Sequence, residues 1–143
     1  MYARKSIMKT SISRLFSFSI LLLTVASCQE KKEDFFERDA REYTEKNCPR
    51  QMDEITRLDS IVFEKGGEMG TLKQYYTLTL TDDARQELMK KLDELGDMNL
   101  KIIRNSVILE KHKRAEVDFD YIYHDEATGD KIAEYHFTPE DYK

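Results

Sequence analysis

The residues with the most defined chemistry form a short run that ends in a thiol. Val25, Ala26, Ser27 and Cys28 follow one another directly. One branched apolar side chain and two small ones let an extended backbone enter a narrow protease site. The cysteine then supplies a thiol that a diacylglyceryl group can alkylate. The run therefore combines a backbone that a narrow protease site can admit with a thiol that can be alkylated.

The residues before this run have the composition of a signal peptide. The leader holds four basic residues and no acidic one: Arg4, Lys5, Lys9 and Arg14. Residues 15–26 are mainly apolar, and at about 1.5 Å per residue they span roughly 18 Å, well short of the ~30 Å hydrocarbon core of a membrane. This length predicts the apolar region of a signal peptide rather than a lasting membrane span. The leader starts at either Met1 or Met8.

The same segment resembles the bacterial lipobox, whose pattern is an aliphatic residue, two small residues and a cysteine. By this resemblance Cys28 is the lipidated new N-terminus and Ser27 the last residue removed. It implies a signal peptide over 1–27 and a lipidated, charged tether over 28–34. Several acyl chains on one residue, at ~0.8 kcal/mol per buried CH₂, make such an anchor effectively permanent.

The residues after the cysteine bear on the cellular location that the resemblance implies. Gln29 follows the cysteine, so the aspartate that typically retains lipoproteins in the inner membrane is absent. Lys32-Glu33-Asp34 is similar to the export signal of Bacteroidota surface lipoproteins. The expected location is the outer membrane, with the protein either exposed at the cell surface or facing the periplasm.

Charge and length limit the partners of the mature chain. Cleavage after Ser27 leaves 116 residues, enough for one domain, with 19 basic and 28 acidic residues and a net charge of −9. Phosphate backbones repel such a surface, so nucleic acid is excluded as a partner. The expected partners are the membrane, through the anchor, and a protein or small-molecule ligand.

The second cysteine is the first candidate for catalysis. If Cys28 carries lipid, Cys48 has no cysteine to pair with in the same chain. A histidine could lower the pKa of Cys48 and make it a nucleophile, but His112, His124 and His136 belong to no recognisable catalytic motif. The other interpretations are a partly buried thiol at a helix corner and a disulfide between two copies. A small envelope hydrolase using Cys48, or a site with Asp59 and His136, is the alternative function.

Acidic residues of the last predicted hairpin are the candidate metal ligands. A loop centred near Ala127 would pair Asp120 with Glu134 and Asp118 with His136, and would place the aromatic side chains of the two strands together on the other face. Like charges placed opposite each other destabilise a strand pair, and a hard cation bound by Asp120, Glu134 and His136 would relieve this. Solvent screening, basic neighbours or another register would also relieve it. We predict no cofactor and no committed metal site.

Two further clusters have simpler interpretations. Lys111-His112-Lys113-Arg114 is the one basic cluster of the mature chain and fits a solvated turn better than a site for an acidic partner. Gly66-Gly67 and Gly70 indicate a hairpin turn, because no helix follows them to hold a phosphate.

Periodicity predicts the elements that carry these residues. Helical spacing and alternation give, in order, a helix over 35–47, a hairpin over 55–63 and 72–80, a helix over 81–95 with a second piece over 98–112, and a hairpin over 116–123 and 131–138. Thr81 is the expected N-cap of the helix over 81–95, and Gly96-Asp97 is expected to interrupt it. The stretch 106–109 could instead begin a strand. The predicted fold is α+β, a four-stranded antiparallel sheet of two hairpins with helices packed on one face, in the order α-β-β-α(-α)-β-β, forming one domain over 35–143.

These features favour a lipid-anchored protein of the cell envelope that is not an enzyme. We expect a binding or accessory module that uses its open sheet face or its hairpin loops.

Overall fold

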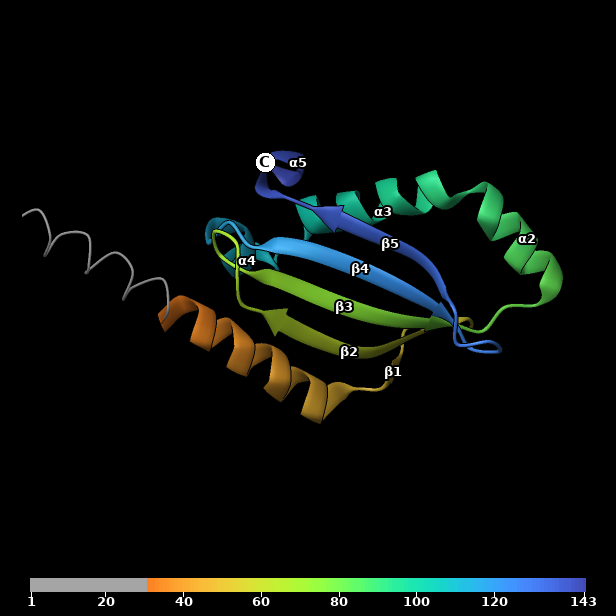
Figure 1. Cartoon of the computed structure of the whole chain (residues 1–143), viewed down its shortest axis with the longest axis horizontal. Coiled ribbons are helices and arrows are strands. Elements are labelled where there is room, and N and C mark those ends of the chain that lie inside the picture. The colour runs from red at the N-terminus through yellow and green to blue at the C-terminus, as the bar shows by residue number, and fades with distance from the viewer. Residues whose placement is uncertain (1–30) are drawn as a thin grey trace, which may run out of the picture.

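The computed structural model describes residues 31–143. The predictions for the leader, for the cleavage site and for the lipidation of Cys28 lie outside the described residues. Within them, five strands form one sheet in the order β1-β2-β3-β4-β5 (Figure 1). The strands are, with their bounds, β1 (Arg50–Gln51), β2 (Thr56–Glu64), β3 (Thr71–Leu78), β4 (Asp118–Asp125) and β5 (Lys131–Phe137).

The two predicted hairpins are confirmed, but the prediction of a wholly antiparallel sheet of four strands is wrong. β2 and β3 pair antiparallel, as do β4 and β5, whereas β3 and β4 pair parallel. The short strand β1 adds a fifth member at the β2 edge. The parallel pairing has a physical reason: the helices between β3 and β4 form a crossover long enough to return the chain to the same end of the sheet.

The helices differ in detail from the prediction. The described chain begins with a helix over residues 31–47, and the crossover contains α2 (Asp82–Lys90), α3 (Leu92–Asn105) and α4 (Glu110–Arg114). Thr81 caps α2 as predicted, accepting a hydrogen bond from the Ala84 N–H at 3.3 Å. The segment over 106–109 is a turn, and a short α5 (Pro139–Tyr142) ends the chain.

The predicted interruption at Gly96 is wrong. The helical break falls at Lys91, and Gly96 lies within α3 on its buried side. A Cβ at residue 96 would lie 2.9 Å from the Cε1 atom of Tyr135 on β5. The glycine therefore allows α3 to approach the sheet closely, which outweighs its low helix propensity.

The helices contact one face of the sheet, as predicted, but they leave its middle uncovered. Helix 31–47 lies along the β2 side, where Phe36 packs on Phe63 with ring centroids 5.5 Å apart (Figure 1). On the β5 side, the Tyr135 hydroxyl donates to the carbonyl of Leu92 in α3 at 2.6 Å. Below, this side of the sheet is called the helix face and the other side the open face.

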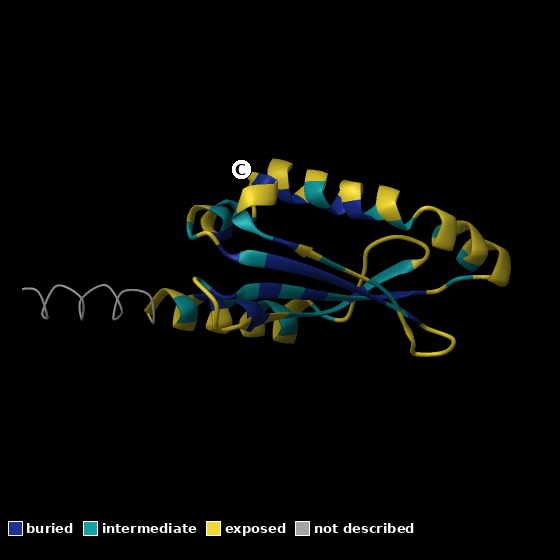
Figure 2. Cartoon of the chain, turned by 45° about the horizontal axis from the view of Figure 1, so that its top comes forward, coloured by how far each residue is buried: buried dark blue, intermediate teal, exposed yellow. Residues whose placement is uncertain are grey.

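The packed core lies where α4 and α5 meet the helix face. Phe119, Val117 and Ile103 have no exposed surface, and Tyr142 packs edge-on against Phe119 at 5.4 Å. β4 has the longest run of buried residues, consistent with its position between two full-length strands (Figure 2). In the described part of the chain, no helix is both long enough and apolar enough to cross a membrane.

The register of the last hairpin corrects the prediction. Asp120 lies opposite His136, and Glu134 lies opposite Ile122, two residues away from the predicted pairing. An irregularity between Tyr123 and His124 displaces the turn toward β5. A shift of two residues keeps every side chain on its face, so the predicted aromatic face is correct although the predicted pairs are not.

Candidate binding groove

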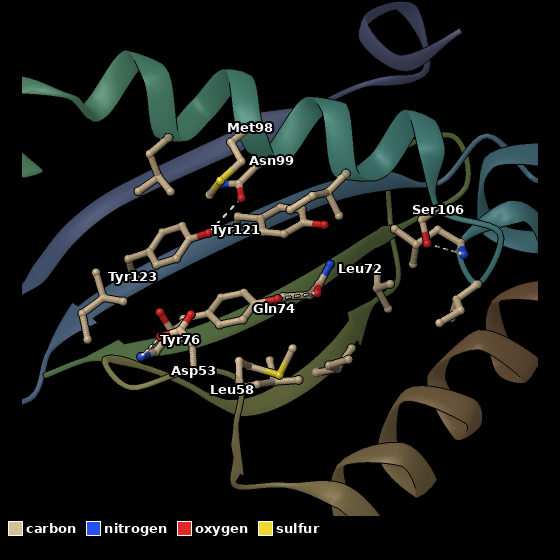
Figure 3. A pocket seen from close by; sticks show the side chains of 18 of the residues that line it. Asp53, Leu58, Leu72, Gln74, Tyr76, Met98, Asn99, Ser106, Tyr121 and Tyr123 are labelled. Atoms are coloured by element: carbon tan, nitrogen blue, oxygen red, sulfur yellow. Dashed lines mark hydrogen bonds between the residues drawn. The ribbon is translucent and has the colours of Figure 1, made fainter.

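The uncovered middle of the helix face forms a groove of about 880 Å³. Strands β2, β3 and β4 form its floor, helix 31–47 one wall, and α2 with α3 the other (Figure 3). Most of the lining is apolar or aromatic. It includes Ala40, Tyr43, Met52, Ile55, Leu58, Leu72, Tyr76, Leu78, Leu88, Leu95, Met98, Ile102, Ile108, Leu109, Tyr121 and Tyr123.

The rim of the groove exposes large apolar side chains on both sides. Met98 and Ile102 of α3 are 50% and 47% exposed, and Met52 and Ile55, across the groove, are 50% and 47% exposed. Ile108, in the turn after α3, is 84% exposed. Clustered apolar side chains that stay in water mark an interaction surface rather than a folding core.

The floor carries tyrosines whose hydroxyls lie at groove level. Burial raises the pKa of Tyr76, Tyr121 and Tyr123, so all three stay protonated at neutral pH. Tyr76 donates to Gln74 Oε1 at 2.9 Å, and Tyr123 donates to Asn99 Oδ1 at 2.9 Å (Figure 3). Most of the floor surface is therefore apolar, and its few polar groups are held in place by hydrogen bonds.

Three buried polar side chains of the lining each leave one nitrogen without a hydrogen bond. These nitrogens are Nε2 of Gln74, Nδ2 of Asn99 and Nδ1 of His112. Gln74 Nε2 is directed toward the Tyr121 hydroxyl but makes no hydrogen bond of normal geometry. Burial also lowers the pKa of His112 to about 4, so its ring is neutral where it packs on Phe36 at 4.6 Å.

The groove holds little charge. Asp39, Asp53 and Lys111 are the charged residues among the described lining. Lys111 pairs with Asp39 at 2.6 Å, and Asp53 accepts from the N–H groups of Ile55 and Thr56. All three charges have partners, so the groove is suited to an apolar and nearly neutral occupant.

The candidate nucleophile does not meet a histidine. Cys48 is half-buried and free of disulfides, and burial raises the pKa of its thiol, with Thr44, Asp59 and Arg50 as its neighbours. Asp59 bonds to Arg57 and Thr77, at 2.7 and 2.5 Å. Because β2 and β5 are not adjacent in the sheet, Asp59 and His136 are separated. The residues of the hydrolase alternative are thus not brought together around Cys48.

The candidate metal ligands are paired with other partners. His136 Nδ1 lies 2.6 Å from Asp120 Oδ1, Lys73 lies 3.8 Å from the same carboxylate, and Glu134 pairs with Lys131. Within residues 31–143, no group of three or more potential ligands has the geometry to hold a metal ion. Basic neighbours and a different register therefore relieve the acidic repulsion without a metal ion.

The basic cluster around residue 112 forms α4 rather than a solvated turn. Lys113 and Arg114 pair with Glu110, and His112 is buried. The groove itself was not predicted from the sequence. The sequence contained two signals for it. The amides of Gln74 and Asn99 lie among apolar residues, and Met98 and Ile102 are apolar although they lie outside the buried side of α3.

A mixed sheet flanked by helices, with an apolar groove between them, defines a class of small α+β domain. The chain belongs to the family described as Domain of unknown function (DUF8479), which matches residues 31–133. No curated relative matches the sequence.

Two solved structures share this fold. One is a Pseudomonas aeruginosa protein assigned as secreted, at 11% identity and a TM-score of 0.66, covering 80% of this chain and 96% of that one. The other is the pilotin of the type 2 secretion system of Vibrio vulnificus, at 8% identity and a TM-score of 0.57, covering 82% of this chain and 97% of that one. At these identities the likeness is one of fold.

Proposed function

We propose that this protein is an outer-membrane lipoprotein of the Bacteroidota type, anchored through Cys28, that binds an apolar helix of a partner protein in its groove. In this role it is an accessory module and not an enzyme. The observation that carries the proposal is the groove of about 880 Å³ with exposed apolar side chains on both rims. The likeness of fold to a pilotin supports an accessory role at the envelope.

The position of the groove favours a helix as the occupant. Its floor is the face of a sheet, and the sheet edges are β1 and β5. An extended segment in the groove would have no strand edge to pair with, and its backbone N–H and C=O groups would be buried unpaired. A helix satisfies these groups internally and presents an apolar stripe to the groove.

The proposed anchor lies close in the sequence to a wall of the groove. The helix that forms one wall of the groove is described from residue 31, and Cys28 lies three residues before that point in the sequence. An anchor at Cys28 keeps the groove close to the membrane and raises the effective concentration of the protein for partners in the same envelope.

The anchor is tested by mass spectrometry of the N-terminal peptide from envelope extracts, with Cys28→Ala as the comparison. We expect an acylated Cys28 in the wild type, and loss of detergent-phase partitioning in the variant. A Cys28→Ala protein that still partitions entirely into detergent would refute the anchor.

The groove is tested with a photocrosslinking amino acid placed at Ile102 in the native envelope. We expect cross-links to a helical segment of one protein, identified by peptide mapping. The double substitution Ile55→Glu/Ile102→Glu should weaken binding of that segment at least tenfold, because it puts a charge on each apolar rim.

The matched control is Val62→Glu on the open face, where the side chain is 46% exposed, close to the 47% of the two groove residues. It should leave binding unchanged. Equal cross-linking from Val62 and Ile102, or cross-links from Ile102 to lipid only, would contradict a protein partner in the groove.

A further inference from the structure

Two amides in the groove have the same hydrogen-bond pattern. Asn99, on α3, is 1% exposed, and its Oδ1 accepts from Tyr123 while its Nδ2 has no partner. Gln74, on β3, is 7% exposed, and its Oε1 accepts from Tyr76, while its Nε2 is directed toward the Tyr121 hydroxyl without the geometry of a normal hydrogen bond. In both residues, a tyrosine hydroxyl donates to the amide oxygen, and the amide nitrogen remains without a hydrogen bond.

Leaving these donors unpaired is costly. A buried polar group without a partner typically costs about 1–3 kcal/mol, and native proteins rarely contain one without a reason. The two donors come from different elements, α3 and β3, yet both residues line the same groove (Figure 3). A leucine at either position would avoid the cost, so the shared arrangement points to an acceptor supplied from outside.

The groove lining next to Asn99 can adjust to an occupant. Met98 precedes Asn99 on α3, lines the same groove and is 50% exposed at its rim (Figure 3). Methionine is unbranched and flexible, so an occupant can displace it with little strain.

We infer that Asn99 determines specificity by donating a hydrogen bond from Nδ2 to a neutral acceptor side chain, Asn, Gln, Ser or Thr, on the apolar face of the bound helix, and that Gln74 offers a second donor in the same groove. This inference rests on the proposed function of the groove. A carboxylate is a poor occupant, because the acceptor is buried in an apolar groove and desolvating a charge costs more than a neutral amide or hydroxyl. One polar residue in an apolar helix interface sets the register of the helix, as it does in coiled coils.

The test uses a displayed library of amphipathic helices as long as α3, 14 residues. Each apolar-face position is randomised among Leu, Ile, Met, Asn, Gln, Ser and Thr, and the library is sorted on the full-length protein in detergent. We expect enrichment of helices with one polar residue at one central position. The selected peptide should bind roughly tenfold more tightly than its leucine counterpart, the effect of about one hydrogen bond.

The double variant Asn99→Leu/Tyr123→Phe removes the donor together with the hydroxyl that its amide satisfies. Replacing both partners with apolar groups is close to neutral for stability, and this variant should prefer the leucine peptide. Tyr123→Phe is the matched control, because it keeps the Asn99 donor and should keep the preference for the polar peptide. Gln74→Met is an independent variant if the double variant does not fold.

The outcomes separate the two proposals. If the wild type enriches only fully apolar helices, or if the double variant keeps the wild-type preference, the inference about Asn99 and Gln74 is wrong while the groove remains a helix site. If no helix is enriched at all, the proposed function fails and the inference fails with it.

Discussion

The two faces of the sheet treat buried polar groups in opposite ways. On the open face, Asp120 is 6% exposed, but its carboxylate bonds to His136 and lies near Lys73. On the helix face, Asn99, Gln74 and His112 each keep a nitrogen without a partner. The charged residues of the open face satisfy one another, whereas the neutral polar residues of the groove do not.

The difference supports the helix face as the binding surface that we propose. A surface whose polar groups are all paired gains little from a ligand, because the ligand would have to replace contacts that already exist. A groove with apolar rims and unpaired donors gains both apolar burial and hydrogen bonds. The sequence favoured the open face or the hairpin loops as the binding surface, whereas the groove lies on the helix face.

His112 in the groove and His136 on the open face show the same contrast in their pKa values. Burial lowers the pKa of His112 to about 4, whereas the hydrogen bond from His136 to Asp120 raises the pKa of His136. Their contributions to stability therefore change with pH in opposite directions.

The largest effect is expected from Phe119→Ala. Phe119 has no exposed surface and packs against Tyr142 and His112 at the filled end of the helix face. The free energy of unfolding should fall by about 3–5 kcal/mol, from lost burial and the cavity left behind. Val62→Ala, on the open face, should change it by no more than about 0.5 kcal/mol. Urea unfolding measures both, and similar losses would remove the distinction between the faces.

The next effect concerns acid stability through His112. Because its folded pKa is about 4 against 6.5 unfolded, its contribution is complete above pH 6.5 and is lost as pH falls toward 4. The loss amounts to about 3 kcal/mol. His112→Phe should remove this part of the acid sensitivity while keeping the ring contact with Phe36. Unfolding free energies of both proteins between neutral and acidic pH test it, and parallel curves would contradict a neutral buried His112.

A smaller effect of opposite sign is expected for His136→Gln. The folded pKa of His136 is raised, so its stabilising contribution is fully present below the unfolded pKa of about 6.5 and is lost as pH rises through the folded value. Because the side chain is 53% exposed, solvent screening limits the effect to less than about 1 kcal/mol. The wild type should lose more stability than the variant between mildly acidic and alkaline pH. A larger loss in the variant would reverse the assignment.

The smallest change concerns Cys48. Burial raises the pKa of its thiol and leaves less thiolate at neutral pH. We expect iodoacetamide to alkylate Cys48 more slowly than it alkylates glutathione, and Cys48→Ser to leave groove binding unchanged. Alkylation faster than glutathione would restore the hydrolase alternative.

The local parts of the fold could be predicted because they depend on neighbours in the sequence. Alternation assigned Tyr121, Tyr123 and Tyr135 to one face, and Thr81 marked the start of α2, since both signals act over a few residues. The register of the last hairpin was wrong by two residues, because an irregularity at His124 leaves no trace in the alternation. The predicted position of the break between α2 and α3 was also wrong, because Gly96 is required by its close approach to Tyr135, a residue far along the chain, and does not end the helix.

The sequence by itself determined which side chains share a face of each strand, because a strand alternates its side chains whatever surrounds it. It also determined the hairpins and most of the helices. Only the tertiary structure decided that β3 and β4 lie parallel, that the helices stand at the two margins of the sheet, and that a groove with unpaired amides lies between them. These features depend on how distant segments pack, and no local pattern encodes the space that they leave open.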